Sequence, residues 1–276
     1  MQEEVLVKFL RLFPSVALVA AFSATLIAQP APPTGFHTMA CIKVKPENNT
    51  EFRKWAAGDV HKFAQSRVDS GALSSWFVLR SIAPAGRSAT CDYVVVSMYP
   101  GVPPQPLGPE ELDAALKKAG ITATAQQYTD RRTSLTTLIS NNIFQNQDSV
   151  GTFKTGDYFR VNYMKVADAN LEDYVAYEKK VWKPFAEAMT KDGVARGWSL
   201  NLRFLPGGSD QPYQAVTVDV FPSWESIFKD DGQFVERFRK VHPDMELGTT
   251  FEHYEKLRSL INIELYVVQD LINSSK

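Results

Sequence analysis

The segments HTMACIKVKPENNTEFRKW (residues 37–55) and FRVNYMKVADANLEDYVAY (residues 159–177) are two copies of one pattern. Each begins with alternating apolar and polar side chains, which are typical of a strand, and continues with helical spacing. The two copies are offset by 122 residues and align without a gap from 37–101 against 159–223. Twelve of these 65 positions carry identical residues, where average composition gives about four. The sequence therefore predicts an internal duplication.

Several identical pairs are residues that fix packing or turn geometry, namely Trp76/Trp198, Gly71/Gly193 and Pro84/Pro206. In the second copy, periodicity predicts strands over 158–166, 197–205, 213–221 and 261–269, and helices over 170–191, 231–241 and 250–258. In the first copy it predicts strands near 37–45, 75–83, 91–99 and 136–144, and helices near 49–69 and 109–134. The order β-α-β-β-α-β, repeated twice, is that of a ferredoxin-like unit.

The predicted fold class is therefore α+β, with two tandem ferredoxin-like repeats packed as one pseudo-symmetric barrel. We expect the first repeat over 29–145, a polar linker over 146–156 and the second repeat over 157–276. Because the duplication supplies both halves of such a barrel, the chain is expected to be a monomer or a weak oligomer.

The N-terminal 28 residues have the features of a secretory signal peptide. Lys8 and Arg11 precede an apolar run over 12–28, and the polar Gln29 follows Ala28. The alternatives are an uncleaved membrane anchor and a buried first helix. Cleavage is the interpretation we follow, because no later segment has a stop-transfer pattern. We expect a protein exported to the periplasm or the extracellular space, which contacts a membrane only if the segment stays uncleaved.

Composition excludes several function classes. Of the 276 residues 44% are apolar and 22% are charged, which is typical of a globular chain. The net charge of −1 and the lack of a basic-aromatic stripe argue against nucleic acid as a partner. Two cysteines and four histidines are too few for a cysteine-rich zinc site, and no two histidines have a metal-binding spacing. We therefore expect neither a metal nor a cofactor.

At the level of topology, residues 35–270 resemble the dimeric α+β-barrel superfamily. The segments YMKVADANLEDY (163–174), YEKKVWKPF (177–185) and GWSLNLRFLPGG (197–208) look most like an exported, uncharacterised branch of it. The resemblance implies a barrel of two ferredoxin-like sheets packed face to face. Relatives include cofactor-free monooxygenases, small isomerases, haem enzymes and ligand-binding proteins, so the fold alone implies no reaction. A haem relative would need an axial histidine, for which the second copy offers His242 or His253 without a matching motif.

In such a barrel, alternate residues of each strand face the interior. On the first strand of the second copy these are Val161, Tyr163 and Lys165, and on the second strand Ser199, Asn201 and Arg203. On the third strand we expect Tyr213, Ala215, Thr217 and Asp219 to face inward, with Val216, Val218 and Val220 covered by helices. The matched positions of the first copy are mostly apolar or aromatic.

This asymmetry indicates candidate ligand-binding residues in the second copy: Tyr163, Lys165, Asn201, Arg203, Tyr213 and Asp219. Interior charges need partners or a ligand. One interpretation is a pocket with a polar floor. The other is a structural salt bridge of Asp219 with Arg203 or Lys165.

Two further sites allow two interpretations each. Glu178 lies in the apolar stripe of a predicted helix, either as a buried general acid or base, or at the edge of the stripe and paired with Lys179 or Lys183. Cys41 and Cys91 fall on neighbouring strands of the first copy, either as a disulfide or as two buried thiols.

These residues support two hypotheses about function. The leading one is an exported barrel that binds a small organic molecule of unknown identity. The alternative is a cofactor-independent monooxygenase or isomerase, in which Tyr163, Asn201, Arg203 and Asp219 stabilise an enolate-like intermediate. The alternative requires these four side chains to converge on one cavity.

Overall fold

The computed structural model describes residues 35–229 and 232–274. The expected signal peptide over 1–28 lies outside these residues. In the part of the chain that the structure describes, no helix is long and apolar enough to cross a membrane.

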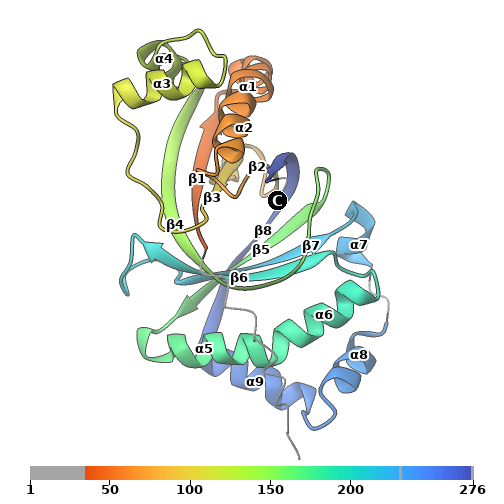
Figure 1. Cartoon of the computed structure of the whole chain (residues 1–276). Coiled ribbons are helices and arrows are strands. Elements are labelled where there is room, and N and C mark those ends of the chain that lie inside the picture. The colour runs from red at the N-terminus through yellow and green to blue at the C-terminus, as the bar shows by residue number, and fades with distance from the viewer. Residues whose placement is uncertain (1–34, 230–231, 275–276) are drawn as a thin grey trace, which may run out of the picture. The chain divides into compact units, whose positions relative to one another are not determined.

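Each repeat contains four strands and its own set of helices (Figure 1). The strands of the first repeat are β1 (Phe36–Val44), β2 (Ser75–Ala83), β3 (Tyr93–Met98) and β4 (Thr136–Gly151). Its helices are α1 (Asn49–Trp55), α2 (His61–Asp69), α3 (Pro109–Lys118) and α4 (Ala125–Leu135). The strands of the second repeat are β5 (Tyr158–Val166), β6 (Gly197–Leu205), β7 (Ala215–Phe221) and β8 (Arg258–Asn273). Its helices are α5 (Leu171–Tyr177), α6 (Lys183–Lys191), α7 (Trp224–Phe228), α8 (Phe234–Val241) and α9 (Leu247–Leu257).

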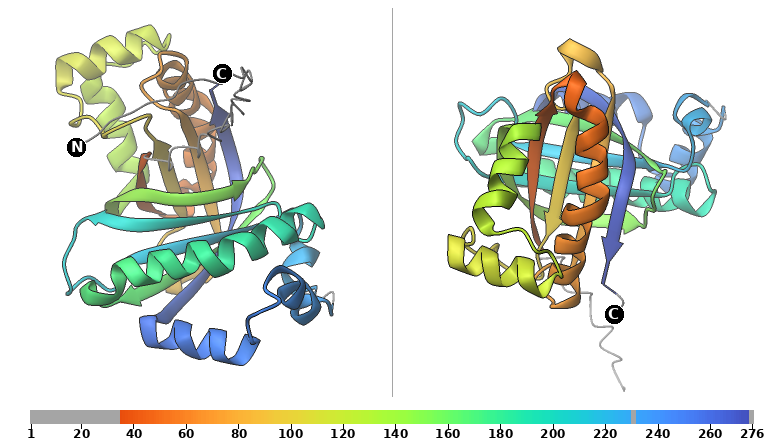
Figure 2. Two further views of the ribbon diagram at one scale, coloured as in Figure 1. Left: turned by 60° about the horizontal axis from the view of Figure 1, so that its bottom comes forward. Right: turned by 90° about the horizontal axis from the view of Figure 1, so that it is seen from above.

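Across the described residues, the strands close into one antiparallel barrel in the order β1-β3-β2-β8-β5-β7-β6-β4. The predicted α+β fold with two β-α-β-β-α-β halves is confirmed. The helices of each repeat cover the outer face of that repeat's strands (Figure 2).

The long strands β4 and β8 join the two repeats. β4 pairs with β1 along its first part and with β6 from Ile143 to Gly151. β8 pairs in the same way with β5 and then with β2 from Leu265 to Asn273. The expected linker over 146–156 is therefore wrong in its first part, because β4 continues to Gly151 and only 152–157 connect the repeats.

Backbone irregularities recur at equivalent positions of the two repeats. A π-helical turn interrupts the first long helix of each repeat, at Ala56–Val60 and at Glu178–Trp182. Pro184, a residue type that often kinks a helix, lies in the first turn of α6, after the π-helical turn. Because the first repeat has Lys62 there and the same turn, proline is not the cause.

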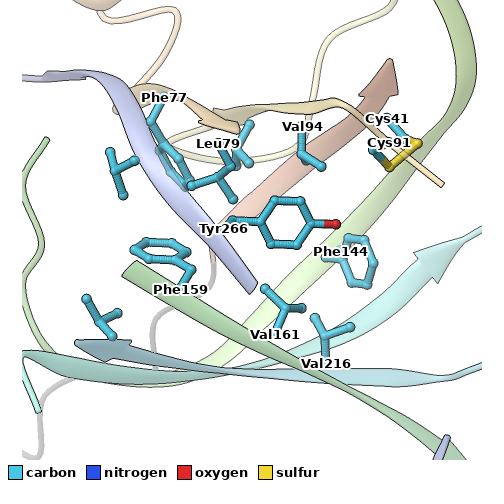
Figure 3. Close-up of a cluster of buried hydrophobic side chains, with 13 residues drawn as sticks. Cys41, Phe77, Leu79, Cys91, Val94, Phe144, Phe159, Val161, Val216 and Tyr266 are labelled. Carbon is cyan, nitrogen blue, oxygen red and sulfur yellow. A yellow bond between two sulfur atoms is a disulfide. The ribbon is translucent and has the colours of Figure 1, made fainter. Parts of the chain in front are cut away.

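A buried cluster from both repeats lies between the sheets (Figure 3). The rings of Phe144 and Tyr266 lie within it, and the Cys41–Cys91 disulfide lies at one edge. A second and a third cluster lie outside the barrel, between each sheet and its helices. The barrel interior is thus a separate hydrophobic core, lined by side chains of both repeats.

Candidate functional site

A cavity of about 460 Å³ lies inside the barrel, among side chains that point inward from both repeats. Most of its lining is apolar: Met39, Phe77, Leu79, Phe159, Val161 and Val218. The strands explain this composition, because inward positions of β1, β2 and β3 alternate with positions that face the helices. No lysine, arginine, aspartate or glutamate is found among the described residues that line the cavity.

His37 is the one titratable group among the described residues of this lining. It is buried on β1, and its ring stacks on Phe144 with the centroids 5.5 Å apart. Burial lowers the pKa of His37 to about 4, because the low-dielectric interior disfavours the imidazolium. The imidazole is therefore neutral at physiological pH. Its Nδ1 atom has no hydrogen-bond partner within the described chain.

Polar side chains gather on the β4 and β6 side of the cavity. Asn146 donates from Nδ2 to Oδ1 of Asn201 over 3.0 Å, and Asn201 donates from Nδ2 to Oγ of Ser199 over 3.0 Å. All three residues line the cavity. This row of amides and a hydroxyl, together with His37, provides the polar groups that would orient a bound molecule.

Two glycines form the seam where β4 meets β6 at the cavity. Gly151 and Gly197 are directly paired, and Gly151 has a φ of +73°. A Cβ atom on Gly151 would lie 2.1 Å from the carbonyl oxygen of Arg196, so only glycine permits this approach. Phe153 follows on the connection between the repeats and packs edge-on against Phe77 and Phe159.

Comparisons with known proteins support the architecture. No family model matches the sequence, and no curated protein matches it significantly. Among solved structures, a candidate monooxygenase from Fusobacterium nucleatum has a TM-score of 0.54 at 8% identity, covering 87% of this chain and 94% of that one. A candidate monooxygenase from Lactobacillus acidophilus has a TM-score of 0.50 at 10% identity, covering 87% of this chain and 97% of that one.

The chain has the dimeric α+β-barrel fold. Identities this low carry no information about activity. A single chain provides all the strands of this closed barrel.

Of the six candidate residues, only Asn201 lines the cavity. Tyr163, Arg203 and Tyr213 do come together, but at the other end of the barrel interior. The rings of Tyr163 and Tyr213 are 4.8 Å apart, and the Arg203 guanidinium lies 4.2 Å above the Tyr213 ring. The Phe144 ring separates this group from His37, because it stacks on both His37 and Tyr213.

Glu264 and Tyr266, which were not predicted from the sequence, complete this tyrosine group. The Glu264 carboxylate accepts hydrogen bonds from the Tyr163 hydroxyl over 2.7 Å, from the Tyr266 hydroxyl and from Nδ2 of Asn262. Burial raises the pKa of Tyr163 and of Tyr266, so both phenols stay protonated and donate. Glu264 thus satisfies the hydroxyls of Tyr163 and Tyr266, and the residues of the group do not line the cavity.

Lys165 is placed by the backbone of the β6–β7 hairpin. Its Nζ atom donates to the carbonyl oxygens of Ser209, over 2.6 Å, and of Gln211. Arg203 donates to Oε1 of Gln211 in the same hairpin over 3.1 Å. These contacts hold the hairpin rather than a ligand.

The prediction that Asp219 faces inward is wrong. Asp219 lies on the outer face of β7, where Oδ2 accepts from Arg160 over 3.0 Å and from Asn162 over 2.9 Å. Val216, Val218 and Val220 face the interior in its place. Asp219 therefore forms no salt bridge with Arg203 or Lys165, and the four residues of the predicted enzyme site do not converge.

An irregularity before the third strand of each repeat causes this error. Gln214 turns its side chain to accept from the backbone N–H of Val166 over 3.0 Å, and Asp92 accepts from Val44 over 2.8 Å at the equivalent position. The residue before each of them, Tyr213 or Cys91, faces inward, and strict alternation is then lost.

Glu178 is buried, and its carboxylate makes no ion pair with Lys179 or Lys183. Lys183 pairs with Asp148 instead, over 2.9 Å. The interpretation of Glu178 as a residue at the edge of the stripe is therefore wrong. The carboxylate lies between the helices and the outer face of the second sheet, in a separate place from the cavity.

The cysteines form a disulfide, with a Cα–Cα distance of 5.2 Å. Neither histidine of the second repeat faces the interior. His242 is bonded through Nε2 to the carbonyl oxygen of Val181 over 2.8 Å, and the ring of His253 packs against Tyr177 on the helical layer. Neither could bind a haem iron inside the barrel. Among the residues described, no cluster of metal-ligating side chains occurs.

Proposed function

We propose that this chain is an exported binding protein that holds a small, uncharged organic molecule in the barrel cavity beside His37. The observation that carries the proposal is a neutral imidazole whose buried Nδ1 atom has no hydrogen-bond partner within the described chain, in a mostly apolar cavity. An orphaned buried polar atom costs free energy unless a ligand or water satisfies it. The volume of about 460 Å³ is within the range of small-molecule sites.

The lining indicates the chemistry of the ligand. An ionised ligand would lose hydration without meeting a countercharge, so the site favours a neutral molecule. The phenyl rings of Phe77, Phe153 and Phe159 offer edges and faces to an aromatic ring. His37 and the Asn201 row can bind one hydroxyl or carbonyl group. We therefore propose an aromatic alcohol, phenol or ketone.

Export is supported by the disulfide and by the N-terminal sequence. Disulfides persist in oxidising compartments and are rare in the cytosol. Mass spectrometry of the mature protein is expected to find its N-terminus at or near Gln29, and an intact Met1 would contradict export.

Thermal shift with three related compounds tests the proposal. We expect 1-naphthol to raise the melting temperature, naphthalene to raise it less and the anionic 1-naphthoate to leave it unchanged. His37→Phe, which introduces the residue found at the equivalent position 159, should remove the advantage of naphthol over naphthalene. Tyr213→Phe is the matched control outside the cavity and should keep it. Equal responses to all three compounds would contradict the proposal.

A second candidate is cofactor-independent catalysis with His37 as a general base. The buried Nδ1 atom without a partner within the described chain, in a mostly apolar cavity, favours it. A group with a pKa of about 4 is nevertheless a weak base for a carbon acid, so binding is the function that the site supports best. Hydrogen–deuterium exchange at the α-carbon of 1-tetralone, followed by NMR, separates the two. Catalysis requires faster exchange with the unaltered chain than with His37→Phe, whereas pure binding requires equal rates.

A further inference from the structure

A group of buried polar atoms lies on the outer face of the second sheet, beneath α5, the π-helical turn and α9. None of these atoms has a hydrogen-bond partner within the described chain: Tyr174 OH, Glu178 Oε2, Trp198 Nε1, Asp219 Oδ1, Tyr254 OH and Arg258 Nε. Buried polar atoms are satisfied in the great majority of native structures. Six orphans in one layer therefore indicate that something else occupies the space between them.

The elements bring these residues into one place. Trp198 and Asp219 are direct neighbours across the β6–β7 ladder. Tyr174, Trp198 and Tyr254 belong to one buried cluster, and the Arg258 guanidinium lies 5.5 Å from the centre of the Tyr254 ring. Glu178 stands on the π-helical turn one turn after Tyr174.

The orphans include both donors and acceptors. The indole of Trp198 and the guanidinium of Arg258 can only donate, whereas the two carboxylates accept and the two phenols do either. Donors and acceptors that make no direct hydrogen bond with one another suit ordered water, which typically makes about three hydrogen bonds in a buried site.

The first repeat shows that the fold does not require this group. Its π-helical turn has the same position, but Ala56 replaces Glu178, Phe52 replaces Tyr174 and Ser97 replaces Asp219. The polar group is thus an addition to the second repeat, made on a duplicated backbone.

We propose that this group is a binding site for internal water and for one exchangeable proton, carried by Glu178. The protonation state of Glu178 determines how stably the helices of the second repeat pack against their sheet. Because β6 and β7 present the cavity on their other face, through Ser199 and Val218, the site lies directly behind the cavity wall. The proposal does not depend on the identity of the ligand.

The electrostatic surroundings support a proton on Glu178. Burial raises the pKa of Glu178 to about 7, and the charge of Asp219 adds to the rise. Arg258 lowers it, as does the Tyr174 hydroxyl, which is close without meeting hydrogen-bond geometry. Asp219 is itself held by Arg160 from β5. The remaining charged or titratable neighbours are Tyr254 from α9 and His242 from the end of α8, which is bonded to the π-helical turn.

The pH dependence of unfolding tests the proton. Well below pH 4.5 Glu178 is protonated in both the folded and the unfolded chain. Between the unfolded pKa of 4.5 and the folded pKa of about 7, only the unfolded chain ionises freely, so the folded chain loses stability as pH rises and this loss levels off above about 7. In Glu178→Gln this loss is absent. We expect the ratio of the unfolding constants of the unaltered chain and Glu178→Gln to rise roughly thirtyfold between pH 5.5 and 8.5.

Two further measurements complete the test. Glu187→Gln, an exposed glutamate on α6, is the matched control and should follow the unaltered chain at every pH. Glu178→Ala introduces the first-repeat residue and should also remove the dependence. Parallel curves for the unaltered chain and Glu178→Gln would overturn the proton site. A high-resolution crystal structure should show water within hydrogen-bond distance of the orphaned atoms, and a dry cluster would overturn the water site.

Discussion

The two repeats have the same backbone and use it differently. At one pair of inward positions the first repeat has the disulfide Cys41–Cys91, and the second has the rings of Tyr163 and Tyr213. The first repeat thus links these two positions by a covalent bond, and the second links them by an aromatic pair whose Tyr163 hydroxyl donates to Glu264. Duplicated positions fix the backbone and leave the side chains free to diverge.

The divergence also divides the roles of the repeats. The first repeat contributes His37 to the cavity, where the second has Phe159, and the second contributes Asn201, where the first has Leu79. On the outer faces, the second repeat has the buried Glu178 where the first has Ala56. The cavity groups His37 and Asn201 therefore each occur in only one repeat, with an apolar residue at the equivalent position of the other.

The largest expected effect concerns the seams between the repeats. One seam ends at the pair Gly151–Gly197, and the other ends at Ser75–Asn273, whose side chains are hydrogen-bonded over 2.9 Å. Gly151→Ala should cost about 4 kcal/mol or more of unfolding free energy, because its Cβ would collide with the Arg196 carbonyl at a positive φ.

Gly193→Ala is the matched control for this substitution. Gly193 has the same φ of +73°, but a Cβ atom added there would meet no atom within 4 Å, so its loss should be near ~1 kcal/mol. Denaturant unfolding measures both. Equal losses would show that the close approach at the β4–β6 seam is not what requires glycine.

Most of the fold could be predicted from the sequence because the 122-residue repeat fixes the order of the elements. The extensions of β4 and β8 could not, because their pairing partners belong to the other repeat and leave no local periodicity. Alternation along β5 and β6 correctly predicted which of their side chains face inward. On β7 it placed Asp219 on the wrong face, because the Gln214 side chain turns back to accept from the Val166 N–H and the alternation restarts one residue later.

The site was predicted less well than the fold. His37 lies two residues before Met39 on the same strand face, so extending the alternation by one step would have found it. Glu264 and Tyr266 were missed because no parity was assigned to the last strand, whose register shifts at Tyr163/Met164. The charged residues pointed to the second repeat, whereas the cavity depends on a neutral group in the first.

Removing the disulfide should have the next largest effect. Cys41→Ala with Cys91→Ala opens a crosslink between residues separated by 50 in sequence, which should cost about 2–4 kcal/mol by freeing the unfolded chain. The equivalent change in the second repeat, Tyr163→Phe, removes one donor from Glu264 and should cost less, about 1–2 kcal/mol. A larger loss of unfolding free energy for Tyr163→Phe than for the double cysteine variant would contradict this ranking. Guanidinium unfolding of oxidised protein is the measurement.

The stability that His37 contributes changes with pH in the opposite direction to that of Glu178. The folded chain keeps His37 neutral down to a pH of about 4, whereas an unfolded imidazole takes up a proton near 6.5. Stability from this group is therefore complete above about 6.5 and is lost as pH falls towards 4, by up to about 3 kcal/mol. His37→Phe should remove this acid-side loss and keep the loss at high pH. Unfolding curves from about pH 4 to 8 that are parallel for the two proteins would exclude a depressed pKa.

The smallest effect is expected at the two polar side-chain pairs that connect each helical layer to the long strand of the other repeat. His61 Nδ1 lies 2.8 Å from Asp270, and at the equivalent positions Lys183 Nζ lies 2.9 Å from Asp148. Both pairs are partly exposed, and Asp148 is the more buried carboxylate, at 15% side-chain exposure against 27% for Asp270. Exposed pairs contribute little because water and salt screen them, so Asp270→Asn should cost below about 1 kcal/mol of unfolding free energy and Asp148→Asn slightly more.

His61→Lys gives the first repeat the same lysine–aspartate pair as the second, and should change the unfolding free energy by no more than about 0.5 kcal/mol. Double-mutant cycles at low and high salt measure the coupling in each pair. A coupling above about 2 kcal/mol, or one that roughly 1 M salt leaves unchanged, would contradict the description of these pairs as solvent-screened contacts.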